Sequence, residues 1–213
     1  MGLIARLEDF NQRHPWSHND HFGRWVTRQV AASGAREVLD VGCGTGNLID
    51  RLRHHAAVTG LEPDPVCVAR AAGRFAGDPA VTVQRAGFAD CDPGRRWDAI
   101  VVVAVLHHLP LTETLRGLRE ALRPGGRLVV VGCHRESGAA DTAVALASLL
   151  TNPIVGVLAH PRRAGALPAH MRAPTTAPAE TLREITRGAA RELPGARIRR
   201  RLFWRYTLVY DQP

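Results

Sequence analysis

Short, β-rich apolar runs alternate with helical stretches from residue 37 onwards, and this alternation restricts the fold more than any other feature of the chain. The apolar runs lie at 37–42, 57–62, 80–86, 97–106 and 126–133, and the helical stretches at 46–55, 65–75 and 111–123. Strands and helices in this order are joined by right-handed crossovers. They therefore predict an α/β fold with a mostly parallel sheet and helices on both faces.

The segments outside this region predict a cap and an end to the sheet. Residues 1–34 precede the first strand and are expected to form an N-terminal helical cap, leaving 35–213 as a single domain. A helix is expected near 179–192. Two strand-like runs within 195–213 are expected to end the sheet with an antiparallel pair.

Residues 135–178 are predicted to form a helical and loop insertion that covers the substrate. The apolar stretch 142–159 is interrupted by Asn152-Pro153, which predicts two short buried helices in place of a membrane span. The proline-rich part, 161–179, predicts a long surface loop. The run "LRPGG" at 122–126 predicts a helix stop and a turn before the next strand.

Composition narrows the class of protein. A chain of 213 residues suits one well-buried domain, and no signal-peptide pattern opens it. Its four cysteines are widely spaced without a CxxC pair, which indicates reduced thiols and a cytoplasmic protein. The formal net charge is +8, but all 28 basic residues are arginine. We attribute this mainly to a coding bias, so a nucleic-acid partner is not favoured.

The turn "VLDVGCGTGNL" at 38–48 is the strongest candidate for a ligand site. Glycines at 42, 44 and 46 allow a sharp turn and a close approach of the backbone to a ligand. The next helix directs its free N–H groups at that ligand. The pattern is GxGxG, because Asn47 stands where a dinucleotide fingerprint has its third glycine. Glu62, at the end of the second strand, is placed to accept hydrogen bonds from ribose hydroxyls.

Together, "LDVGCGTGNL", Glu62, "WDAIVVVAVLHHL" and "LRPGGRLVVVG" resemble the class I S-adenosylmethionine-dependent methyltransferases. The resemblance is close over 37–134 and holds in outline elsewhere. It implies a Rossmann-like, seven-stranded sheet with an antiparallel last strand. It also implies S-adenosyl-L-methionine as cofactor and S-adenosyl-L-homocysteine as product. The implied cofactor-binding residues are Asp40, Gly42, Cys43, Gly44, Gly46, Asn47, Glu62, Pro63, Phe88, Ala89, Asp90 and Val103.

The loop after the third strand departs from this family. Relatives often have an aspartate there that receives the adenine amino group, but this chain has Gly87. Asp90 is a substitute acceptor and Phe88 a stacking partner, although Phe88 also suits simple core packing.

Histidines gather where the acceptor of the methyl group is expected. His107 and His108 end the fourth strand, and His134 ends the fifth. A neutral histidine is a suitable base where the acceptor must lose a proton. His107 and His108 are therefore candidate catalytic residues, and His134 is a candidate substrate contact.

The stretch "HPWSHNDHFGRW" at 14–25 predicts a helix that begins with a capping box formed by Ser17 and Asp20. Helical spacing puts His18, His21 and Trp25 on one face. We interpret the stretch as a lid over the pocket. His18 and His21 are further catalytic candidates, and Trp16, Asn19 and Trp25 candidate substrate contacts. Aromatic packing alone is the alternative, and a metal site is not favoured.

The sequence thus predicts methyl transfer to an O or N atom of a small molecule by a monomer or homodimer. A lipid or quinone precursor, RNA or protein as the acceptor are alternatives. A non-catalytic S-adenosylmethionine binder is another.

Overall fold

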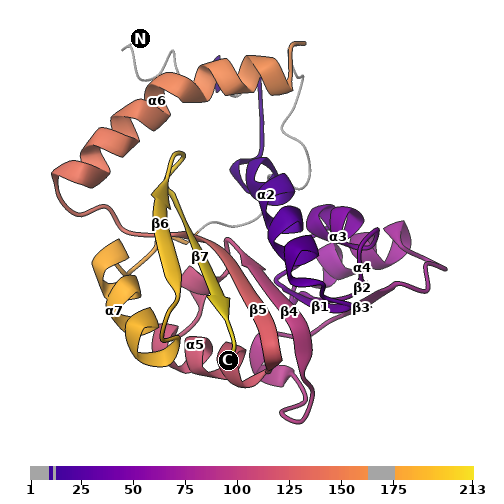
Figure 1. Cartoon of the computed structure of the whole chain (residues 1–213). Helices are drawn as coiled ribbons and strands as arrows, with labels where there is room; N and C mark the ends of the chain where they lie inside the picture. Colours follow the sequence, from indigo (N-terminus) through magenta and orange to yellow (C-terminus); the bar gives the residue numbers. More distant parts are fainter. Residues whose placement is uncertain (1–9, 12, 163–175) are drawn as a thin grey trace.

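A computed structural model describes residues 10–11, 13–162 and 176–213, and it places seven strands in one sheet (Figure 1). The strand order is β3-β2-β1-β4-β5-β7-β6. Five strands are parallel, namely β1 (Glu37–Val41), β2 (Ala57–Leu61), β3 (Val81–Gln84), β4 (Trp97–Val103) and β5 (Leu122–Cys133). The strand β7 (Arg205–Asp211) runs antiparallel to β5, and β6 (Arg197–Arg201) antiparallel to β7. The predicted fold class is confirmed, including its antiparallel end.

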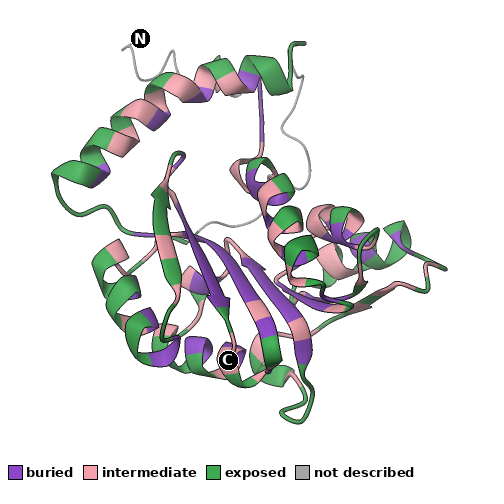
Figure 2. Ribbon diagram, viewed as in Figure 1, coloured by how far each residue is buried: buried purple, intermediate pink, exposed green. Residues whose placement is uncertain are grey.

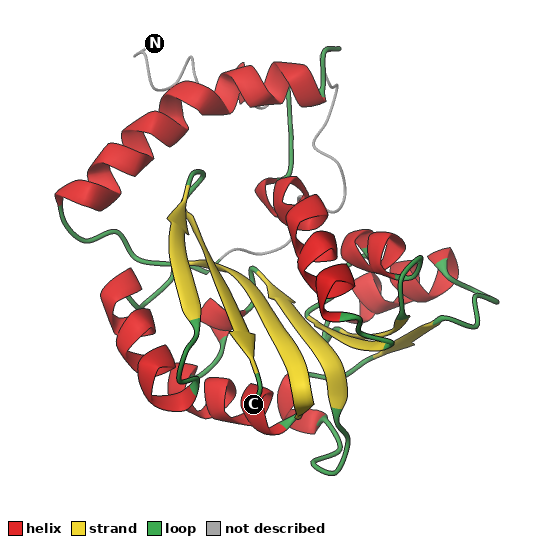
Figure 3. Cartoon of the chain, viewed as in Figure 1, coloured by secondary structure: helices red, strands yellow, loops and turns green. Residues whose placement is uncertain are grey.

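Helices cover both faces of this sheet (Figure 3). One face carries α2 (His18–Ser33), α3 (Asn47–Leu52) and α4 (Pro65–Arg74). The other carries α5 (Leu111–Glu120) and α7 (Leu182–Glu192). Because side chains alternate along a strand, β4 contributes to two cores. Its Ala99 and Val101 pack with α2, whereas Ile100 packs with α5 and α7.

The segment 122–126 differs from its prediction. It belongs to β5, which begins at Leu122 and pairs with β4 through an irregular register between Trp97 and Ala99. Gly125 has φ +77° within this irregularity, a value that a residue with a side chain rarely adopts. The glycines therefore form a bulge in the strand in place of a separate turn.

The segment 142–159 also differs from its prediction. One continuous helix, α6 (Ala139–Ala159), runs through Pro153, and most of its large apolar side chains are exposed (Figure 2). A proline removes only one hydrogen bond of a helix, and contacts of Ser148 and Gly156 on either side hold this one to the protein. Within the described residues, α6 alone has the length and composition of a membrane-spanning helix. Most of the predicted loop 161–179 lies outside the described residues.

The turn between β6 and β7 has an unusual backbone. Phe203 and Trp204 have φ values of +61° and +56°, in the left-handed region that bulky residues avoid. Phe203 is 2% exposed, and its backbone N–H donates to Oγ of Ser148 in α6. The hairpin tip is thus tied to α6, toward which it points (Figure 1).

Candidate functional site

The glycine loop follows β1, beside the point where the strand order reverses between β1 and β4. Gly42, Gly44 and Gly46 have φ values of +72°, +54° and +83°. A Cβ on Gly42 would lie 2.2 Å from Cγ2 of Val105, so a side chain there is excluded. A Cβ on Gly44 would meet no atom within 4 Å. The loop is therefore packed at Gly42 and open at Gly44, which leaves room for a ligand against its backbone.

Glu62 fastens this loop to the end of β2. Its Oε2 accepts from the Gly44 N–H at 2.9 Å, and its Oε1 accepts from the Asp64 N–H at 2.9 Å. Asp64 in turn caps α4 through Cys67 N–H at 2.8 Å. An ionised carboxylate has about four acceptor positions, so Glu62 retains acceptors for a ligand's hydroxyls.

Asp40 lies beneath the loop and is 2% exposed. Its Oδ2 is buried and has no hydrogen-bond partner among the described residues. Burial, together with the negative charge of Glu62, raises the pKa of Asp40 to about 7. A buried carboxylate oxygen without a hydrogen-bond partner destabilises the fold unless a donor or a positive charge reaches it. The loop end of β1 therefore suits a ligand with a cationic or donating group.

Two other loop residues are held by the protein itself. Asn47 Nδ2 donates to Asp20 Oδ2 at 3.2 Å, and Asn47 Oδ1 accepts from Arg74 Nη1 at 2.9 Å. The Cys43 side chain is buried against Gly60, and burial raises the pKa of its thiol. Neutral Cys43 is therefore a packing residue rather than a nucleophile.

The loop after β3 forms the short helix η1 (Phe88–Asp90). Asp90 Oδ2 accepts from the Gly87 N–H at 2.8 Å, so this carboxylate stabilises the turn. The Phe88 ring packs against Gly117 of α5, where a Cβ would lie 3.2 Å from it. Ala89, Asp90 and Pro63 are exposed at this edge. Adenine contacts by Phe88 and Asp90 stay predictions.

At the end of β4, half-buried Val103 precedes the helix η2 (Leu106–His108). The centroids of the His107 and His108 rings lie 4.0 Å apart. Nδ1 of His107 is buried and has no partner among the described residues, whereas His108 is exposed. Burial, with the charges of His108 and Arg205, lowers the pKa of His107 to about 4. His107 is therefore a neutral ring with a free nitrogen at neutral pH.

The first turn of α2 contacts the β6–β7 turn and α6. Ser17 Oγ accepts from the Asp20 N–H at 3.1 Å, which confirms the predicted N-cap. His18 stacks on Phe203, with ring centroids 5.5 Å apart, and its Nε2 lies 3.0 Å from Asn152 Oδ1 of α6. Burial lowers the pKa of His18 and that of His21. Trp16 and His21 also pack edge-on against Phe203.

Comparison with known proteins identifies the family to which this chain belongs. The model of a methyltransferase domain family matches residues 39–128. An uncharacterized methyltransferase of Mycobacterium tuberculosis is 33% identical over 204 residues, which cover 93% of this chain and 98% of that protein. The chain belongs to the class I S-adenosylmethionine-dependent methyltransferases. Two further similarities are partial or distant.

One is to a ubiquinone biosynthesis O-methyltransferase of Methylobacterium nodulans, which is 34% identical over 120 residues, 54% of this chain and 47% of that protein. The other is to the solved structure of a DhpI–SAH complex, with a TM-score of 0.59, 18% identity, and coverage of 98% of this chain and 93% of that chain. The second similarity supports the fold alone.

The family implies S-adenosylmethionine, and the site of this methyltransferase has features that fit it. The unpartnered Oδ2 of Asp40 suits the cationic methionine part of the cofactor. The open backbone at Gly44 and the spare acceptors of Glu62 suit an extended ligand with a ribose. Within the described ranges, no cluster of three His, Cys, Asp or Glu side chains has the geometry of a metal site.

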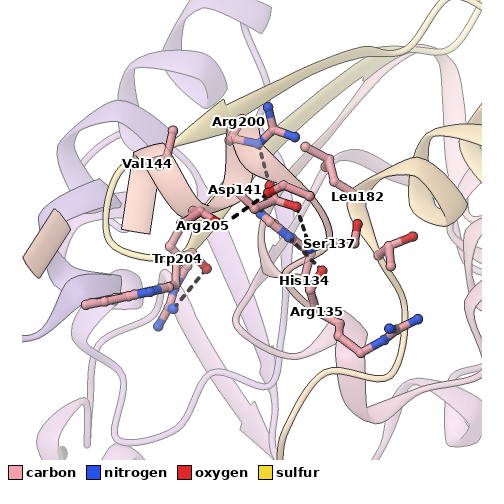
Figure 4. A network of polar contacts seen from close by, with 12 residues as sticks. His134, Arg135, Ser137, Asp141, Val144, Leu182, Arg200, Trp204 and Arg205 are labelled. Atoms are coloured by element: carbon pink, nitrogen blue, oxygen red, sulfur yellow. Dashed lines mark hydrogen bonds and ion pairs between the residues drawn. The ribbon is translucent and has the colours of Figure 1, made fainter. Parts of the chain in front are cut away.

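Two predicted acceptor contacts of the methyltransferase, His134 and Trp25, are engaged by other side chains of the protein. Buried His134 has Nε2 4.0 Å from Asp141 Oδ1, and the same oxygen forms an ion pair with Arg200 Nε at 2.7 Å (Figure 4). This network ties β5, α6 and β6 together. Trp25 lies under the guanidinium of Arg201, 6.0 Å from the ring centroid.

Sequence reasoning missed Arg205. This residue begins β7 and pairs in register with Cys133, which places it at the same sheet edge as His107. Its Nη2 and Nε donate to Asn19 Oδ1 at 3.1 and 3.3 Å. The signal was its position at the start of an antiparallel last strand, whose first residue lies at the carboxyl edge of the parallel strands.

Proposed function

We propose that this enzyme transfers a methyl group from S-adenosylmethionine to an oxygen or nitrogen atom of a small molecule. The observation that carries the proposal is the pair of carboxylates at the glycine loop. Oδ2 of Asp40 is buried with no hydrogen-bond partner in the described part of the chain, and Glu62 holds the loop while keeping acceptors free. When bound, S-adenosylmethionine supplies a methyl group on a positively charged sulfur, which is already an activated leaving group. The chain then mainly has to align the acceptor.

His107 and Arg205 are the residues we assign to the acceptor. The neutral His107 ring can take a proton from a hydroxyl as the new bond forms, or from the ammonium group that an amine becomes once it is methylated. Asn19 orients the Arg205 guanidinium through two hydrogen bonds. Within the described part of the chain, Arg205 donates its hydrogen bonds to neutral oxygens of Asn19, Phe203 and Trp204. An acceptor with an acidic group therefore suits this edge.

A second candidate is an apolar acceptor such as a lipid or quinone precursor. A groove of about 470 Å³ beside α2 favours it, because most of its lining is aromatic or aliphatic. This lining includes Trp25, Val144, Leu202 and Phe203. The name of the ubiquinone biosynthesis relative agrees with this class of acceptor.

A transfer assay with S-adenosylmethionine labelled in the methyl group tests both candidates. The panel contains phenols, amines, carboxylic acids and isoprenoid quinols. The proposal expects label in at least one class, and expects His107→Gln to lower kcat more than His108→Gln does. S-adenosylhomocysteine binding without transfer to any acceptor would support the non-catalytic binder instead.

A further inference from the structure

The helix α6 buries its polar face and exposes its apolar face, which is the reverse of an ordinary surface helix. Its buried positions are polar or small: Asp141, Ser148, Asn152 and Gly156. Its exposed positions include large apolar side chains: Leu146, Leu150, Ile154, Val157 and Leu158, which are 58%, 65%, 61%, 37% and 77% exposed. Leu146, Leu150, Ile154 and Leu158 follow one another at intervals of four, and Val157 lies three residues after Ile154, so they form one stripe along the helix.

The inward face of α6 is held by specific contacts, which fix the stripe outward. Ser148 Oγ accepts from the Phe203 N–H at 2.8 Å, and Asn152 Oδ1 lies 3.0 Å from His18 Nε2. At Gly156 a Cβ would lie 2.8 Å from the backbone oxygen of His14, so the helix backbone approaches the chain closely there. Rotation of α6 to bury its leucines would break all three contacts.

A contiguous apolar stripe of this kind marks an interaction site. The charges around it indicate what it contacts. Asp141 is the sole charged residue of α6, and it points inward to the Ser137 N–H and Arg200. Arginines lie near both ends of the helix. Exposed Arg162 follows its last turn, and Arg200, whose guanidinium pairs with Asp141, lies near its first turn.

We propose that the outward face of α6 docks on the surface of an anionic lipid membrane. The stripe would enter the apolar boundary, and exposed Arg162 beyond its last turn would meet a lipid phosphate, while the formal net charge of +8 favours an anionic surface. A second copy of this chain fits less well, because each copy carries a formal net charge of +8 and two such chains repel each other. This inference does not depend on the proposed acceptor.

Flotation of the full chain with lipid vesicles tests the docking. Wild type is expected to float with vesicles of phosphatidylcholine and phosphatidylglycerol, weakly with phosphatidylcholine alone, and less as salt is raised. The double variant Leu150→Glu/Ile154→Glu removes two exposed apolar side chains and should lower the partition coefficient about tenfold or more. Val66→Glu is the matched control, because Val66 is 56% exposed on α4, far from α6 in Figure 1.

The two variants must keep the circular-dichroism spectrum and Tm of wild type, since all three positions are exposed. The proposal fails if wild type does not float with anionic vesicles, or if the double variant floats as well as Val66→Glu. It also fails if light scattering finds a dimer that the double variant converts to monomer, because the stripe would then join two copies. Vesicle-bound protein that resists alkaline carbonate would indicate a spanning helix and would overturn surface docking.

Discussion

The backbone N–H of Gly44 lies 2.9 Å from Oε2 of Glu62, so the carboxylate after β2 fixes the open part of the loop after β1. The same carboxylate accepts from Asp64, which begins α4. One side chain thus sets the distance between the two segments that would hold the methionine and ribose parts of the cofactor.

Replacing Glu62 with alanine is therefore expected to weaken S-adenosylmethionine and S-adenosylhomocysteine binding by about 1.5–3 kcal/mol, because charge-assisted hydrogen bonds are lost. Calorimetric titration measures the change. Glu113→Ala, an exposed carboxylate in the first turn of α5, is the control and should bind as wild type does. Equal affinities of folded Glu62→Ala and wild type would remove Glu62 from the site.

Asp40 should make the ligand-free protein less stable as the pH rises. Its pKa is about 7 in the fold and 3.8 in the unfolded chain, so the folded state binds the proton more tightly. Its contribution to the free energy of unfolding is fully present below pH 4 and is lost as the pH passes 7. This contribution is on the order of 2–4 kcal/mol in total. Urea unfolding at pH 5 and pH 8 compares wild type with Asp40→Asn.

The Asp40→Asn variant should lose this dependence and should bind S-adenosylmethionine more weakly. Equal pH slopes for the two proteins would show that Asp40 keeps its charge in the fold. The control is Glu120→Gln, at an exposed carboxylate in α5.

His107 should titrate well below an ordinary histidine. Burial lowers the pKa of its ring to about 4, so the neutral ring stabilises the fold above pH 6.5 and this contribution is lost as the pH falls toward 4. Histidine-ring NMR signals, assigned with His107→Gln and His108→Gln, report the midpoint directly. A His107 midpoint near 6.5 would mean that solvent reaches the ring freely. With an acceptor in hand, the acidic limb of kcat should follow the same low value if His107 is the base.

Ser148→Ala should loosen α6 from the hairpin. The buried Phe203 N–H would lose its acceptor, which costs about 1–3 kcal/mol. Thr142→Ala is the matched control, since the hydroxyls of Ser148 and Thr142 both donate to a carbonyl four residues earlier but Thr142 is exposed. Hydrogen exchange of the Phe203 amide should accelerate in Ser148→Ala only. Unchanged protection would show that other contacts hold the hairpin tip.

Local patterns were enough to predict the sheet and the glycine loop. The β-rich runs and the spacing of Gly42, Gly44 and Gly46 lie within short segments, so each predicts its own structure. The orientation of α6 could not be read in the same way. Its partners, His18 and Phe203, lie 134 and 55 residues away from it in the sequence. A nearly continuous apolar pattern does not reveal which side of a helix will face the protein. Arg205 was missed for a related reason, because the register with Cys133 exists only in the assembled sheet.

At the turn formed by Phe203 and Trp204, backbone strain and side-chain packing favour different residues. Asparagine and glycine adopt these φ values readily, so relief of backbone strain alone would favour them in this hairpin. That exchange would remove the Phe203 ring, against which Trp16, His18 and His21 pack. Loss of this buried ring would cost about 3–5 kcal/mol, more than the about 1–3 kcal/mol of strain at its backbone. Selection for heat resistance should therefore keep Phe203 and the strained turn with it.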